Sequence, residues 1–183
     1  MRLWNPATSQ PAGALLHASA QNGVTGVAFS PAATLLASGD GDGTVRLWNP
    51  VTGRPADAPI HASARNGVSA VAFSPAGTLL ASGDGDGTVR LWNPVNGQAA
   101  GALLHASAEN GVSAVAFSPA GTLLASASGD GTVRLWNLAT RRPVGAPLRV
   151  GSGPDHRRLV AVFSPGGALI GSCWSASPTV APP

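Results

Sequence analysis

Hydrophobic positions along the chain fall in short runs in which apolar residues alternate with small or polar ones. In one representative stretch these runs are "VSAVAFS" from Val68, "TLLAS" from Thr78, "TVRLWN" from Thr88 and the weaker "QAAGALLH" from Gln98. Each has about the length of a typical strand, roughly five to seven residues, and turn-forming residues fill the gaps. Because the gaps are too short for crossover helices, consecutive strands must pair antiparallel. The pattern predicts an all-β protein made of four-stranded antiparallel meanders.

The same unit recurs along the chain with a fixed period of 44 residues, which three residue types keep. They are the tryptophans Trp4, Trp48, Trp92 and Trp136, the phenylalanines Phe29, Phe73 and Phe117, and the histidines His17, His61 and His105. A single sheet of this size cannot bury both of its faces, so neighbouring units have to stack.

The stretch "VAFSPAGTLLASGDGDGTVRLWN" from Val71, with a histidine upstream, resembles the WD-repeat β-propeller family. The resemblance covers roughly residues 1–172 and implies β-propeller blades of four antiparallel strands. Residues 173–183, "CWSASPTVAPP", depart from the repeat and are predicted to form a frayed C-terminal tail.

The resemblance also implies a hydrogen-bonded tetrad of His, Ser, Asp and Trp in each blade. The matching residues are His17, Ser38, Asp42 and Trp48, then His61, Ser82, Asp86 and Trp92, then His105, Ser126, Asp130 and Trp136. Two features depart from the family: Leu16, Ile60 or Leu104 replaces the usual glycine before the histidine, and the loop after it is longer. Whether the histidines reach their tetrad positions is therefore open.

Each end of the chain carries only two strands of the four-stranded unit. "RLW" from Arg2 matches a third strand and residues 11–16 a fourth, whereas "RRLVAVFS" and "GALIGS" near the other end match a first and a second. The strands of the whole chain add up to about four blades. Three arrangements are compatible with this number: a strained four-blade ring, an open arc, or an eight-blade ring of two chains. We expect an open arc for the isolated chain, with exposed edges that favour self-association into a closed ring.

The first residue of the chain suggests an alternative. Met1 stands where the other units have a valine, such as Val45, so we also consider that the chain is a fragment of a longer WD-repeat regulatory protein with no independent activity.

The amino-acid composition further restricts the class of protein to which the chain can belong. The chain is 44% hydrophobic and 10% charged, which argues against disorder, and its formal net charge is +3. All basic residues are arginines, a bias typical of GC-rich bacterial coding sequences, and without interleaved aromatics they do not favour nucleic-acid binding. A lone Cys173 excludes an intramolecular disulfide, and no apolar run is long enough to span a membrane. We expect a cytoplasmic protein.

Two motifs could carry chemistry. "GDGDGT" from Gly39 and from Gly83 resembles part of a calcium loop, but it lacks a terminal glutamate and flanking helices, so a tight turn is the better interpretation. Ser, His and Asp also recur together, yet an enzyme needs one such site rather than one in every period. We expect no catalytic residue, no metal site and no cofactor.

Near-identical repeats differ most in the fourth strand and in the loop that follows it. Residues with neutral, positive and negative side chains occupy one position of this loop, and the family resemblance puts the loop on a partner-binding face together with the turn after the second strand. The candidate partner-binding residues are Gln21, Arg65 and Glu109 in the loops and Asp40, Asp84 and Ser128 in the turns. The alternative is neutral drift on exposed loops. The predicted function is a non-enzymatic interaction scaffold that binds a protein or peptide.

Overall fold

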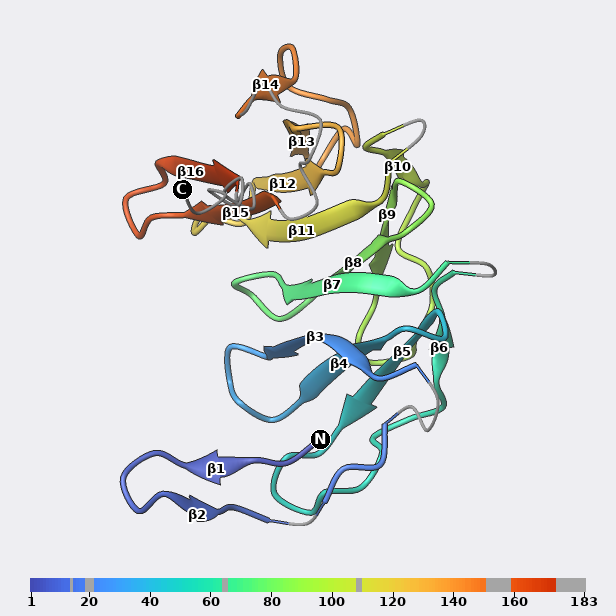
Figure 1. Ribbon diagram of the computed structural model, residues 1–183, viewed down its shortest axis with the longest axis vertical. Coiled ribbons are helices and arrows are strands. Elements are labelled where there is room, and N and C mark those ends of the chain that lie inside the picture. The colour runs from blue at the N-terminus through green and yellow to red at the C-terminus, as the bar shows by residue number, and fades with distance from the viewer. Residues whose placement is uncertain (14, 19–21, 64–65, 108–109, 151–158, 174–183) are drawn as a thin grey trace, which may run out of the picture.

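The structure, a computed structural model, describes residues 1–13, 15–18, 22–63, 66–107, 110–150 and 159–173. All regular secondary structure within these ranges is β (Figure 1). The strands are β1 (Trp4–Asn5), β2 (Gln10–Pro11), β3 (Val24–Phe29), β4 (Leu36–Asp40), β5 (Thr44–Trp48), β6 (Ile60–His61), β7 (Val68–Phe73), β8 (Leu80–Asp84), β9 (Thr88–Trp92), β10 (Leu104–His105), β11 (Val112–Phe117), β12 (Leu123–Ser128), β13 (Thr132–Asn137), β14 (Leu148–Arg149), β15 (Leu159–Phe163) and β16 (Leu169–Cys173).

The strands form three complete antiparallel sheets, which we call blade 1 (β3 to β6), blade 2 (β7 to β10) and blade 3 (β11 to β14). The two-stranded sheets β1–β2 and β15–β16 lie at the ends of the array. This confirms the prediction of an all-β fold in repeated four-stranded units. The fourth strand of each blade is shorter than its sequence run, because only two residues of it pair continuously with the third strand, as Leu104 and His105 do with β9.

Close contact between neighbouring blades makes the core. Val68 and Val71 of β7 contact Gly39 of β4, where a Cβ atom would lie only 2.6 Å from Val68 Cγ1. The same contact recurs between Val112 of β11 and Gly83 of β8. Glycine on the second strand thus lets the valines of the next blade approach the sheet, so that the apolar residues are buried between blades.

The array is an open arc rather than a closed barrel. The sheets β1–β2 and β15–β16 are not paired with each other, and they lie well apart along the longest axis (Figure 1). The four-blade ring considered from the sequence is therefore not the arrangement of this chain.

The C-terminal boundary differs slightly from the sequence prediction. The predicted tail begins at Cys173, but Cys173 is the last residue of β16, where it pairs with Leu159. The rest of the predicted tail, residues 174–183, lies outside the described residues.

Candidate functional site

Each complete blade contains a buried hydrogen bond between its tryptophan and a serine on the neighbouring strand. Trp92 on β9 donates its indole N–H to Ser82 Oγ on β8 over 3.1 Å. The equivalent distances are 3.1 Å for Trp48 to Ser38 and 2.9 Å for Trp136 to Ser126. The bond satisfies polar groups that would otherwise be buried without a partner. Two of the four proposed tetrad members therefore meet in every complete blade.

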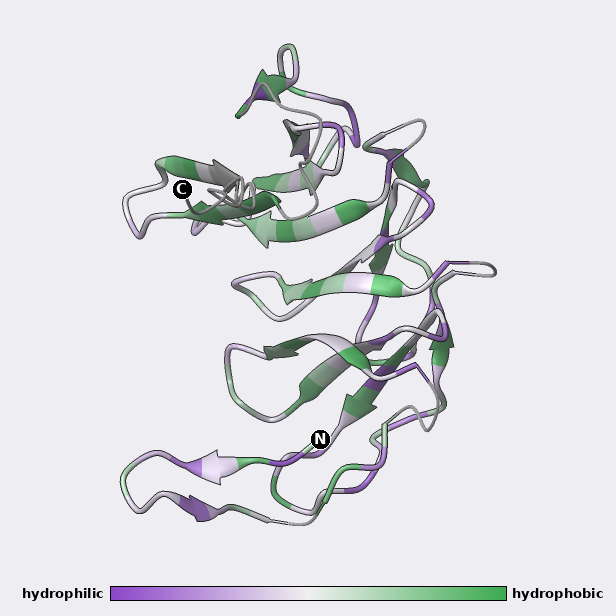
Figure 2. Ribbon diagram, viewed as in Figure 1, coloured by the Kyte–Doolittle hydropathy of each residue, from purple (hydrophilic) through white to green (hydrophobic). Residues whose placement is uncertain are grey.

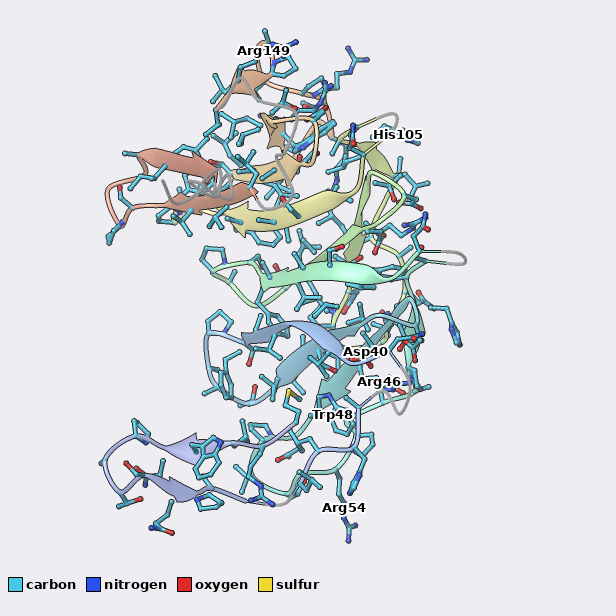
Figure 3. The ribbon with its side chains drawn as sticks, in the orientation of Figure 1. Asp40, Arg46, Trp48, Arg54, His105 and Arg149 are labelled. Atoms are coloured by element: carbon cyan, nitrogen blue, oxygen red, sulfur yellow. The ribbon has the colours of Figure 1, made fainter. Side chains whose placement is uncertain are left out.

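The histidines lie outside this arrangement. The side chains of His17, His61 and His105 are exposed, and Figure 3 shows His105 at the outer edge of its blade. Successive residues of a strand point to opposite sides of the sheet, and burial of Ile60 turns the next residue, His61, towards solvent. Because the apolar residue that replaces the family's glycine is buried, the histidine after it does not reach the tetrad position.

The aspartates assigned to the tetrad cap the turn before the third strand instead. Asp86 Oδ1 accepts hydrogen bonds from the backbone N–H of Thr88 at 3.0 Å and from its hydroxyl at 2.6 Å. Partial burial by itself would raise the pKa of Asp86, but the hydrogen bonds from Thr88 and the charge of Arg90 outweigh it and hold the pKa below its ordinary value. Asp42 and Asp130 cap their turns in the same way.

A second aspartate in the same turn is buried and ion-paired. Asp84 has no exposed surface and pairs with Arg90 Nη1, while Arg90 Nη2 lies 3.1 Å from Asp86 Oδ2. Burial raises the pKa of Asp84 to about 7, against the lowering effect of the Arg90 charge. Asp40 repeats the pairing with Arg46 in blade 1, where the two side chains meet in Figure 3.

Blade 3 lacks this ion pair because Ser128 stands at the aspartate position. Ser128 Oγ and Arg134 Nε are both buried without a hydrogen-bond partner among the described residues. Burial of Asp40, Asp84 and Ser128 also corrects their assignment as partner-binding residues. The turn folds under the loop of its own blade, so these side chains point into the protein rather than towards a partner.

The surface at this end of the strands is formed by the loops 22–23, 66–67 and 110–111 and the turns 41–43, 85–87 and 129–131, in which Asn22, Asp42, Asn66, Asp86 and Asn110 are exposed. We call it the loop face. Backbone hydrogen bonds join each turn to its loop: Gly85 N–H donates to the Gly67 carbonyl at 2.9 Å, and Gly129 N–H to that of Gly111 at 3.0 Å. The loop face is therefore held by the sheets themselves.

Asparagines occupy equivalent exposed positions on the loop face, namely Asn22, Asn66 and Asn110. They are not among the residues predicted from the sequence, although "NG" before the first strand of each complete blade is a visible signal. The predicted loop residues Gln21, Arg65 and Glu109 lie outside the described residues.

Neither a metal-binding cluster nor a membrane-spanning helix occurs in the described part of the chain. It contains no group of three or more His, Cys, Asp or Glu residues placed to hold a metal ion. It also contains no helix long and apolar enough to cross a membrane.

Four-stranded antiparallel blades that stack face to face, each with a Trp–Ser hydrogen bond inside, define a repeat protein built from propeller blades. Comparison with family profiles identifies the repeat as "WD domain, G-beta repeat" over residues 13–49, 59–93 and 102–137. These segments make up more than half of the chain, which therefore belongs to the WD40 repeat family. Repeats of this family generally serve as non-enzymatic scaffolds for protein interaction. Comparison with curated proteins finds no match.

Proposed function

We propose that this protein is a non-enzymatic scaffold that binds a protein or peptide partner through its loop face. The observation that carries the proposal is the repeated exposed asparagine, which stands at the same place in successive blades on loops fixed by backbone hydrogen bonds. Rigid sheets that present loop side chains can bind with little loss of conformational entropy.

The chemistry of the loop face suits a polar partner segment. The exposed side-chain amides of Asn66 and Asn110 each carry donors and an acceptor. A peptide in an extended conformation presents backbone donors and acceptors that these groups could pair. We propose that the neutral, positive and negative residues Gln21, Arg65 and Glu109 then determine which partner binds.

The proposal is tested with variants that add charge at one end of the strands. In a pull-down with the purified chain, Asn66→Arg combined with Asn110→Arg should abolish capture of a partner that the unmodified protein recovers. Val95→Arg, at a highly exposed turn position at the other end of the strands, is the matched control and should keep binding. Equal capture by both variants would show that the loop face is not the binding surface.

A second test addresses partner choice. Exchanging the charges with Arg65→Glu and Glu109→Arg should change which partner is recovered while the circular dichroism spectrum stays unchanged. Recovery of the same partner with the same affinity would remove these positions from the proposal.

We also propose that the chain self-associates into a closed ring in a cytoplasmic setting, because the ends of an open arc leave apolar surface uncovered. The alternative, a fragment of a longer regulatory protein without independent activity, predicts an aggregating chain or a protease-sensitive monomer. Light scattering of the purified chain separates these outcomes.

A further inference from the structure

The two-stranded sheets at the ends of the arc correspond to the two halves of one blade. Trp4 of β1 pairs with Pro11 of β2, as Trp48 pairs with Pro55 between the third strand and the following segment of blade 1. The sheet β15–β16 instead occupies the place of a first and a second strand, because β15 packs against β11 as β11 packs against β7. The pairing that would join the two halves is that of β16 with β1.

The faces of the blades are complementary as well. We call the face of a blade that packs on the next blade its leading face, and the opposite one its trailing face. On the trailing face of blade 2, Val71 is 9% exposed because blade 1 covers it. The equivalent Val27 on blade 1 is 55% exposed, and Phe29 beside it is 52% exposed.

Among the described residues, only the two strands β1 and β2 lie on this side of blade 1. Met1 and Leu3 cover Leu36 and Trp48 at the outer part of the trailing face. On the inner part, which a first and a second strand would cover, Val27 and Phe29 stay more than half exposed. A hollow of about 410 Å³, lined in part by Met1 and Val27, lies on this face.

The opposite end of the arc exposes the surface that would fit there. Leu159 and Ala161 of β15 are buried against blade 3, whereas the residues between and beside them point away from it. These leading-face residues are Val160, 52% exposed, Val162, 48% exposed, and Ile170, 55% exposed. Figure 2 shows hydrophobic residues along β15 and β16. Within the chain, apolar leading faces like this one are covered by the valines of the next blade.

We propose that a second copy of this chain covers both ends. The leading face of β15–β16 of one copy packs on the trailing face of β3 of the other, and β16 pairs antiparallel with β1 to complete the split blade. We assign the cover to a second copy because β1–β2 and β15–β16 of one chain lie far apart along its longest axis (Figure 1). Two copies joined at both ends make the eight-blade ring. This inference rests on the self-association proposed above and supplies its contact strands.

The equivalent pairing in blade 1, where Leu47 pairs with Ala37 and Trp48 with Leu36, gives the register of the new pairing. Leu3 packs on blade 1 and so belongs to a leading face, which places it opposite Ile170, while Trp4 lies opposite Leu169. Leu3 already uses its carbonyl to accept the Ala12 N–H at 2.9 Å, so its polar groups point away from β16. Leu3 and Ile170 therefore form a non-hydrogen-bonded pair, whose Cα atoms lie about 4.5 Å apart, within the range of a disulfide.

Cross-linking between two different variants tests this contact. The native Cys173 is first replaced by alanine, and a chain carrying Leu3→Cys is mixed with a chain carrying Ile170→Cys under mild oxidation. We expect a disulfide-linked dimer on a non-reducing gel. A mixture of Val95→Cys with Ile170→Cys, both highly exposed positions, controls for random collision and should give at least tenfold less product.

Other outcomes overturn the inference. If the mixture gives no dimer while the double variant Leu3→Cys, Ile170→Cys forms a disulfide within one chain, the ring closes without a second copy. If the unmodified protein is a dimer but the mixture does not cross-link above the control, self-association stands and the proposed strand pairing fails. Neither result bears on partner capture by the loop face.

Light scattering with surface variants provides an independent readout. The unmodified chain should have twice the 18.1 kDa mass of one copy. Val27→Arg and Val162→Arg, at exposed positions of the two ends, should each give a folded monomer with unchanged circular dichroism. A monomeric unmodified protein, a dimer in both variants, or a polymer that grows with concentration would each refute closure by two copies.

Discussion

Replacing Gly83 by alanine tests the contact that stacks the blades. A Cβ at this position would lie 2.6 Å from Val112 Cγ1 and 3.1 Å from Val115 Cγ1, whereas carbon atoms in contact are about 3.5–4.0 Å apart. Gly83 lies in a sheet of blade 2 and Val112 in a sheet of blade 3, so relief of this clash requires the two blades to separate. Overpacking of this kind costs about 1–3 kcal/mol, and loss of chain freedom in the unfolded state returns about 0.4–1 kcal/mol. We expect Gly83→Ala to lower the free energy of unfolding by about 1–2 kcal/mol.

A double-mutant cycle measured by urea unfolding with tryptophan fluorescence identifies the cause. Val112→Ala alone should cost about 2 kcal/mol for the lost methyl groups and the cavity. In the double variant the new methyl group enters this space, so the combined loss should be smaller than the sum by about 1 kcal/mol or more. The control is Gly166→Ala, where the nearest atom, Ser164 Oγ, is 3.9 Å away and the change should stay within about 0.5 kcal/mol. Additive losses, or an equal loss at Gly166, would refute the proposed clash.

The polar groups of the blades lead to three more predictions. Ser82→Ala leaves the buried indole N–H of Trp92 unpaired and should lower the free energy of unfolding by about 1–3 kcal/mol in urea titration; an unchanged midpoint would contradict this. Ser128→Asp supplies Arg134 with a carboxylate, so a double-mutant cycle with Arg134→Met should give a coupling of about 1 kcal/mol or more; zero coupling would contradict it. The pKa of Asp84 is about 7 in the folded protein, whereas its ordinary value is 3.8. Between these two pH values the folded state binds more protons than the unfolded state. The free energy of unfolding therefore falls as pH rises through this window, by up to about 4 kcal/mol. Asp84→Asn should flatten the pH dependence of the melting temperature in this window. An unchanged slope would show that Asp84 is not the group responsible for it.

Much of the fold could be predicted because its signals are local. Alternation of apolar and polar residues, turns rich in glycine and proline, and the fixed period together define the strands and their antiparallel order. The short fourth strand was harder, because its weak run "QAAGALLH" from Gln98 pairs continuously only over Leu104 and His105. A run of apolar residues indicates where a strand can form, whereas its length depends on which backbone groups reach the neighbouring strand.

The candidate site could be predicted only in part for the same reason. The Trp–Ser hydrogen bond, as between Trp92 and Ser82, was implied by the resemblance to the WD-repeat family. The direction of His61 depends on whether it or Ile60 enters the core, and the burial of Asp84 depends on the loop that covers its turn.

The sequence by itself determined the blade: its four strands, its turns and the split order of strands at the two ends. Only the tertiary structure decided which side chains of the turns are buried, which asparagines remain on the surface, and which apolar faces stay uncovered. The physical reason is that strand formation depends on residues close in the chain, whereas burial depends on a neighbouring blade. Val71 and Val27 occupy the same place in the repeat, yet one is 9% and the other 55% exposed, because only the first has a complete blade beside it.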